Sequence, residues 1–206
     1  MSIYQWTRDL HLYLGLFVSP FVVLFALSVF FLNHARSPAD STPTNTTTVH
    51  NLRIPPGIEE TQDMERVRQV REIIAQAGVN GEINFIRYVA RESRLIIPVQ
   101  KPGIETTVDV DLERRTATVS ERKTTAWERL SYLHRMPGPH NASIRGNWFW
   151  TRAWRWLADA TVWLVLFLSI SGIYMWAVLK SERKVGLVLL LAGALSFGGM
   201  VYAVIA

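Results

Sequence analysis

Residues 10–32 read LHLYLGLFVSPFVVLFALSVFFL, and this stretch decides the fold class. It contains no Asp, Glu, Lys or Arg, and His11 is its only side chain that can carry a positive charge. A helix needs roughly 20 such residues to cross the hydrocarbon core of a bilayer, at about 1.5 Å of rise per residue. The stretch therefore predicts a membrane-spanning helix. We interpret it as an uncleaved anchor, because it is longer than the ~7–15 apolar residues of a signal peptide.

Two further apolar stretches have the same character. Residues 157–179 read LADATVWLVLFLSISGIYMWAVL, with Asp159 near their start, and residues 185–206 carry no charged side chain. We therefore predict an integral membrane α-helical protein with three transmembrane helices, within residues 1–34, 155–179 and 185–206. The long segment between the first two helices predicts a small exported α+β domain.

Basic residues in a short loop indicate how the chain is oriented. The loop between the second and third spans is KSERK, residues 180–184. Short loops rich in Lys and Arg stay in the cytoplasm, whereas long loops are exported largely regardless of their charge. The N-terminus is therefore expected in the cytoplasm and residues 35–154 outside. Because the net charge of +5 owes much to loops and the membrane boundary, nucleic acid is not an expected partner.

The segment between the first two spans divides into a linker and a compact unit. Residues 35–60 include the polar stretch SPADSTPTNTTT, which has no apolar periodicity and predicts a linker. Residues 61–123 predict the α+β domain. Apolar side chains recur at helical spacing over residues 63–77, with Thr61 as the expected N-cap and Gly78 as the stop.

The rest of this domain has apolar residues at every second position. Runs with this pattern begin at Ile83, Arg94, Glu105 and Thr116, and the sequences KPG and ERR lie where turns are required. These runs predict a short antiparallel sheet after the helix. A unit of roughly 60 residues buries only a modest core, so we expect it to pack against the membrane part or a partner.

Residues 124–154 are expected to form a segment along the membrane surface. Trp127, Leu130 and His134 fall on one face of a predicted helix that ends before Pro137. The residues that follow are rich in tryptophan, which is typical of the boundary between lipid and water.

Arginines surround the start of the second span. Arg145, Arg152 and Arg155 could bind an anionic ligand or contact lipid headgroups, and we favour headgroup contacts for Arg152 and Arg155. Asp159 follows Arg155 by four residues, which predicts an ion pair on the helix surface.

Three parts of the chain together resemble the PepSY-associated transmembrane (PepSY_TM) family. WTRDLHLYLGLFVSPFVVLFALSVFF resembles its opening helix, in which Trp, His and Gly precede a long apolar run. YLHRMPG, followed by WRWLADATVWLVLFLSISGIYMWAVL, resembles its second block, whose helix ends in Ser/Thr-Gly-x-x-x-Trp, here Ser171 to Trp176. Between them, VDVDLERRTATV resembles a PepSY domain. This chain differs in having three helices where larger members have four, and Gly138 follows His134 by four positions instead of two.

The resemblance implies a bacterial inner-membrane protein with a periplasmic domain. Members of the family include membrane reductases that carry b-type haem and reduce ferric siderophores or related iron outside the membrane. We therefore expect a haem-b electron-transfer protein, with a quinol as electron donor and a ferric chelate as acceptor. A ferric-chelate (siderophore) reductase is the corresponding hypothesis for an enzyme. In such a protein Arg145, Arg152 and Arg155 could also neutralise haem propionates or attract the anionic chelate.

The histidines restrict where haem could bind. Low-spin haem b needs two imidazoles facing each other across the iron, normally from different helices. His11 and His34 are separated by about 35 Å of helix and cannot share one haem. His34 and His134 both approach the outer rim, so we predict one outer haem ligated by them, with His140 as the alternative ligand. A second haem at His11 would need a neighbouring subunit, a non-histidine ligand or five-coordinate iron.

A second hypothesis belongs to another functional class. The chain could be a non-catalytic accessory or assembly subunit of a larger membrane complex, with the PepSY-like domain as a protein-binding module. The low helix number favours this hypothesis, and the histidines favour haem. The spacing Ala194-x-x-x-Gly198 in the third span predicts close helix packing, within the chain, in a homodimer or in a larger complex.

Overall fold

The computed structural model describes residues 2–34, 44–136, 143–179 and 183–205. The chain divides into two compact units, and both helices α1 and α4 contribute to each of them. The first unit comprises residues 1–22 and 160–206, and the second comprises residues 23–159.

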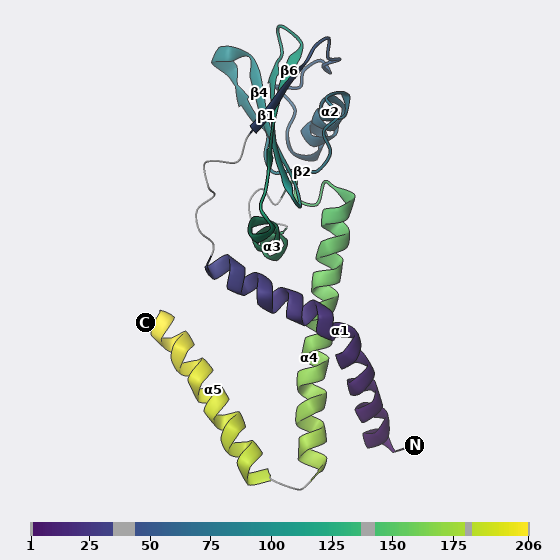
Figure 1. Cartoon of the computed structure of the whole chain (residues 1–206), viewed down its shortest axis with the longest axis vertical. Helices are drawn as coiled ribbons and strands as arrows, with labels where there is room; N and C mark the ends of the chain where they lie inside the picture. Colours follow the sequence, from purple (N-terminus) through teal and green to yellow (C-terminus); the bar gives the residue numbers. More distant parts are fainter. Residues whose placement is uncertain (1, 35–43, 137–142, 180–182, 206) are drawn as a thin grey trace. The chain divides into compact units, whose positions relative to one another are not determined.

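Three long apolar helices confirm the prediction of a membrane protein. They are α1 (Ile3–Asn33), α4 (Phe149–Val178) and α5 (Arg183–Ile205), and each is long and apolar enough to cross a membrane (Figure 1). Helix α4 begins six residues before the expected residue 155. The reason is that residues 149–154 contain neither glycine nor proline and therefore continue the helix.

An antiparallel sheet lies between α1 and α4 in the chain, as predicted. Its strand order is β1-β6-β5-β4-β2, and β3 also pairs with β4. The strands are β1 (Thr44–Val49), β2 (Glu82–Ile83), β3 (Arg87–Val89), β4 (Arg94–Lys101), β5 (Ile104–Asp111) and β6 (Thr116–Lys123). The turns at 101–103 and 113–115 connect β4 to β5 and β5 to β6, where the sequence required them.

Helix α2 (Asp63–Gln76) covers one face of this sheet (Figure 1). Its apolar side chains Val67, Val70 and Ile74 are almost fully buried with those of the central strands. Gly78 has a φ of +72° and ends the helix as expected. The N-cap is Gln62 and not Thr61, because the Thr61 hydroxyl donates to the carbonyl of Ile58.

Strand β1 lies inside the expected linker, so the linker prediction for residues 35–60 is wrong in this part. Thr44–Val49 pairs along its whole length with β6. Five of its six residues are exposed, so the strand has no buried face and leaves no alternating pattern in the sequence. Further along, Leu52 and Ile58 belong to the domain core. Residues 35–43 of the expected linker lie outside the described residues.

Helix α3 (Ala126–Arg135) follows β6 and confirms the helix predicted around Trp127 and His134. Thr125 and Glu128 form a capping box, in which each side chain accepts from the other residue's backbone N–H. Arg122 of β6 also donates to the Glu128 carboxylate, at 2.9 Å. The capped helix start therefore ties α3 to the end of the sheet.

Candidate histidine sites

His11 of α1 contacts Ser171 of α4 inside the first unit. Its Nδ1 atom lies 2.8 Å from Ser171 Oγ, and the Ser171 side chain is buried. The same hydroxyl donates to the carbonyl of Phe167, at 2.7 Å. Because a hydroxyl has one hydrogen, it then accepts a hydrogen bond from His11 Nδ1.

Two glycines let the helices approach at this contact. A Cβ atom on Gly172 would lie 3.7 Å from His11 Cε1, and one on Gly15 would lie 3.6 Å from the Leu168 side chain. Small residues at such positions allow close packing of membrane helices. His11 of the first apolar block therefore meets the Ser171-Gly172 pair of the second, and Gly15 meets Leu168.

His134 of α3 forms the same contact in the second unit. Its Nδ1 atom lies 3.0 Å from Oγ of Ser28 in α1. Ser28 is buried, and its hydroxyl donates to the carbonyl of Phe25 at 2.7 Å. As with Ser171, the hydroxyl accepts from the histidine Nδ1.

The ring of Phe25 contacts His134, and Trp154 packs against Phe25. The Phe25 ring meets His134 edge to face, with centroids 6.4 Å apart, and also packs against Trp154 at 5.8 Å. Trp154 Nε1 donates to the carbonyl of Leu133 in α3, at 3.1 Å. The Phe25 and Trp154 rings thus form an apolar surface next to His134. The Trp154 side chain also holds α3 through the backbone carbonyl of Leu133.

His34 has a different environment, because its partner is its own helix. Its Nδ1 atom donates to the carbonyl of Phe30, at 2.9 Å, and its ring stacks on the Phe30 ring at 4.4 Å. A carbonyl oxygen only accepts, so this contact also places the hydrogen on Nδ1. His34 is exposed.

The three histidines therefore share one tautomer in their neutral form. Nδ1 carries the hydrogen in His11, His34 and His134, and Nε2 keeps its lone pair. No hydrogen bond to Nε2 of His11 or His134 is present among the described residues, and neither atom belongs to their buried unpartnered groups. A metal-ligating imidazole usually has this arrangement, in which the second nitrogen donates to a fixed oxygen.

The structure does not join the predicted ligands to one another. Among the described residues, neither a hydrogen bond nor a ring contact links His34 to His134. Ser28 and His34 are six residues apart, which corresponds to about 9 Å along a helix and to different sides of it. Their pairing across one haem stays a prediction, and His140 lies outside the described residues. No cluster of three or more His, Cys, Asp or Glu side chains suited to a metal ion occurs in the part of the chain that is described.

The sequence reasoning missed both serine partners. A serine within an apolar helix is a weak signal, because it can also satisfy itself on its own backbone, as Ser169 does with the carbonyl of Val165. The adjacent residues Ser171 and Gly172 were a stronger signal. The glycine lets another helix come close, and the serine hydroxyl can then bond to that helix.

A buried carboxylate at the start of α4 was also missed. Glu82 of β2 accepts hydrogen bonds from the backbone N–H groups of Gly146, Asn147 and Trp148, at 2.6, 3.2 and 2.7 Å. The Asn147 side chain in turn accepts from the backbone N–H of Ile83 and donates to its carbonyl. The turn before α4 is thereby bonded to the edge of the sheet.

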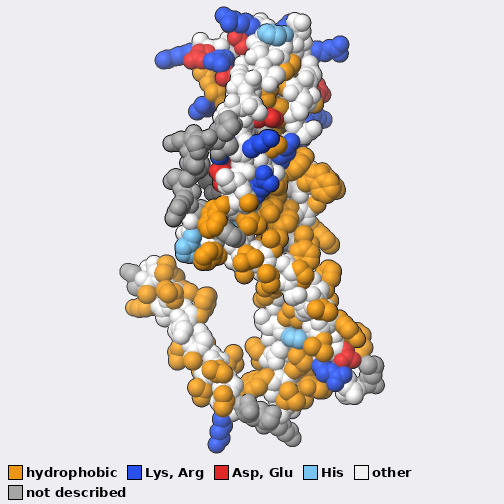
Figure 2. Space-filling model, in the orientation of Figure 1, with side chains coloured by type: hydrophobic (Ala, Val, Ile, Leu, Met, Phe, Trp, Pro, Cys, Tyr) orange, Lys and Arg blue, Asp and Glu red, His pale blue; other side chains and the backbone are white. Residues whose placement is uncertain are grey.

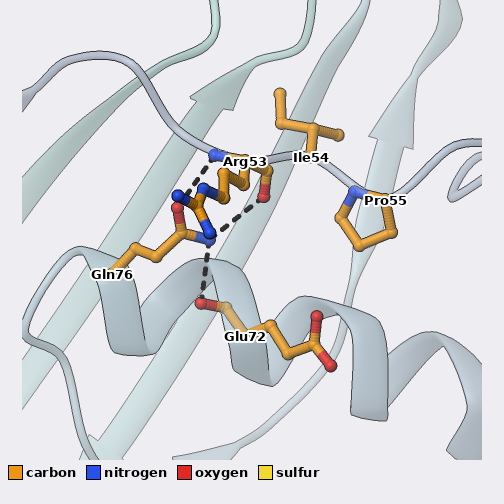
Figure 3. Close-up of a pocket in the computed structure, with 5 residues that line it drawn as sticks. All are labelled: Arg53, Ile54, Pro55, Glu72 and Gln76. Atoms are coloured by element: carbon orange, nitrogen blue, oxygen red, sulfur yellow. Dashed lines mark hydrogen bonds between the residues drawn. The ribbon is translucent and has the colours of Figure 1, made fainter.

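An open pocket lies on the α+β domain, away from the histidines. Arg53, Ile54, Pro55, Glu72 and Gln76 line it (Figure 3). The Gln76 amide accepts from the backbone N–H of Arg53 at 2.8 Å and donates to its carbonyl at 3.0 Å, so it holds the segment before α2 against the helix. Hydrogen bonds between the Gln76 side chain and the Arg53 backbone therefore fix this side of the pocket.

A family model described as Putative PepSY_TM-like matches residues 5–205. The chain belongs to the PepSY_TM-like family. No curated protein and no solved structure matches it. In this PepSY_TM-like protein, the sequence blocks that carry the resemblance are in contact, since His11 and Gly15 of the first meet Ser171 and Leu168 of the second.

Proposed function

We propose that this PepSY_TM-like protein is a haem-b electron-transfer protein of a bacterial inner membrane. In this proposal His134 would hold the haem iron, and His11 is a candidate ligand for a second haem. Electrons from a quinol pass outward to ferric chelates in the periplasm, which makes the protein a ferric-chelate reductase. The observation that carries the proposal is the repeated contact between a histidine Nδ1 and a buried serine hydroxyl.

The chemistry of the residues around His134 fits a histidine that would hold haem iron. Ser28 fixes the imidazole orientation through Nδ1, and the lone pair of Nε2 is left for the iron. Phe25 and Trp154 supply an apolar surface on which a macrocycle could pack and from which water would be excluded. When bound, haem supplies the one-electron redox chemistry, while these side chains set its orientation and access.

A low-spin haem would need a second donor to its iron. His34 is the candidate within the same unit, because its Nε2 also keeps its lone pair. A histidine from a second copy of the chain is the alternative. The choice between them distinguishes a monomeric haem site from a site shared in a homodimer.

An optical spectrum of the detergent-purified protein tests this proposal. We expect sharp b-type bands after dithionite reduction and a pyridine haemochrome count of about one haem or more per chain. His134→Ala should lose the outer haem and the reduction of ferric chelates. His50→Ala is the matched control, because His50 is exposed beside the sheet and should leave the spectrum unchanged. A colourless wild-type protein from haem-replete cells would contradict the proposal.

The pocket beside α2 favours a second candidate function, that of a non-catalytic accessory subunit. Its walls combine apolar Ile54 and Pro55 with charged Arg53 and Glu72, a mixture suited to a protein segment. In this case the α+β domain binds a partner and the helices dock in a larger membrane complex. Ile54→Asp should then abolish co-purification of the partner, whereas His134→Ala should leave it intact.

A further inference from the structure

Four arginines gather around the turn before α4, and we call them the arginine cluster: Arg71, Arg145, Arg152 and Arg155. The Arg71 guanidinium donates to the carbonyl and the side-chain oxygen of Asn147, at 2.5 and 2.6 Å. A Cβ atom on Gly146 would lie 3.2 Å from Arg152 Cγ and 3.9 Å from Arg155 Nη1. Arg145 directly precedes Gly146. Arg71, Arg152 and Arg155 therefore lie beside this turn, and Arg145 is the residue that leads into it.

The cluster lacks carboxylate partners. Among the described residues, no ion pair joins any of its four arginines to Asp or Glu. The pair expected between Arg155 and Asp159 is therefore absent from them. Glu82 lies beside the same turn, but its carboxylate accepts from three backbone N–H groups. Glu82 therefore offsets part of the positive charge of Arg71, but it forms no ion pair with the four arginines among the described residues.

Two of these arginines are also partly buried, which makes their positive charge and their N–H donors more costly to leave without partners. Burial lowers the pKa of Arg71, Glu82 opposes the shift, and the neighbouring charge of Arg152 adds to it. Arg145 Nε has no hydrogen-bond partner among the described residues, although it is buried. A buried donor without a partner is costly, so a ligand with acceptor oxygens would stabilise the cluster.

The position of the cluster at the end of an apolar span indicates which class of ligand it binds. The apolar span of α4 begins at Phe149, so Arg152 and Arg155 lie within its first two turns. Trp150 and Trp156 are 62% and 73% exposed at the same level. Figure 2 shows blue basic side chains next to the orange surface of the apolar residues in this region. Exposed tryptophans and arginines at one end of a span are typical of the lipid headgroup layer.

We propose that the arginine cluster binds the phosphate of an anionic phospholipid. Arg152 and Arg155, three residues apart on one helix face, supply guanidinium groups whose paired N–H donors match phosphate oxygens. Basic pockets at the ends of membrane helices bind such headgroups, and a net positive charge selects anionic over zwitterionic lipid. The exposed aromatic rings contact the lipid below its phosphate.

Lipid titration of the detergent-purified full chain tests the site. Phosphatidylglycerol or cardiolipin is added, with phosphatidylcholine in parallel, and bound lipid is counted by native mass spectrometry together with the Tm. We expect saturable binding and a higher Tm with the anionic lipids only. Arg152→Gln/Arg155→Gln should weaken this binding about tenfold or more. Arg91→Gln/Arg114→Gln removes the same charge from exposed positions of the sheet domain and should bind like wild type.

Three outcomes overturn the proposal. The first is equal binding of anionic lipid by Arg152→Gln/Arg155→Gln and by wild type. The second is displacement of the lipid by millimolar inorganic phosphate, which would make the cluster a site for soluble phosphate. The third is unchanged lipid binding with loss of haem, which would assign the arginines to haem propionates. If the double glutamine variant does not fold, Arg152→Lys/Arg155→Lys keeps the charge and should retain anionic-lipid selectivity with weaker binding.

Discussion

His134 and Ser28 are 106 residues apart in the chain, yet Nδ1 of one lies 3.0 Å from Oγ of the other. His11 and Ser171, separated by 160 residues, form the same contact at 2.8 Å. In each case the serine also donates to its own helix, so its hydroxyl has a defined direction. The protein thus orients two imidazoles by the same local means, and in both of them Nε2 is the nitrogen available to a ligand.

If His134 binds haem as proposed, removing its serine partner should weaken haem binding without removing the ligand. Ser28→Ala leaves His134 without the group that orients it, and we expect about 10–100-fold weaker haem binding. Haem titration of the apoprotein, followed in the Soret band, measures this. Ser19→Ala is the matched control, because the Ser19 hydroxyl bonds only to the Leu16 carbonyl of its own helix. Equal affinities for the two variants would contradict an orienting role.

A side chain added at Gly186 should destabilise the protein. A Cβ atom there would overlap the Trp176 indole, so Gly186→Ala forces α5 and the indole apart. We expect a loss of about 1–3 kcal/mol in stability, seen as a lower Tm in detergent. Gly193→Ala in the same helix is the comparison, since a Cβ atom there meets no atom within 4 Å. A destabilised Gly193→Ala with an intact Gly186→Ala would refute this packing.

Glu82→Gln should loosen the turn before α4. The carboxylate is buried and accepts three backbone N–H bonds, whereas an amide has one oxygen and brings its own NH₂ donor. We expect a loss of about 1–3 kcal/mol. Hydrogen exchange should become faster at residues 146–148, with less change at β5. Glu60→Gln, at an exposed position, should leave the exchange rates unchanged.

Tyr132 should make stability depend on alkaline pH. Burial raises its pKa to about 12, and the charges of Glu82 and Glu105 add to the shift. An unfolded tyrosine loses its proton near pH ~10. Between these values the folded state holds a proton that the unfolded state has lost. Stability from this group is therefore complete below pH ~10 and is lost as pH rises through the folded pKa, by on the order of 2 kcal/mol.

Unfolding of wild type and Tyr132→Phe at several pH values from about 9 to 12 measures this effect. The variant should lose less stability over this range, because its phenyl ring cannot ionise. The ultraviolet titration of the wild type should likewise contain one late phenol that Tyr132→Phe lacks. Parallel pH profiles for the two proteins would show that Tyr132 is not protected from ionisation.

Composition and periodicity were sufficient to predict the three spans, α2, α3 and most of the sheet. A membrane helix depends on the length of one apolar stretch, and a half-buried strand depends on alternation along itself. Both are local properties. The edge strand β1 escaped prediction because it buries neither face, so its place in the sheet comes from pairing with β6 alone.

Tertiary structure decided which groups meet at the candidate sites. The sequence named His11, His34 and His134 but could not show that two of them bond to serines and the third to its own helix. Nor could it show that Glu82 would bond to the turn before α4. A polar side chain in an apolar setting must find a partner, but the partner is selected by packing between segments more than a hundred residues apart for His11 and His134. That packing follows from the whole fold, and a pattern along one segment does not contain it.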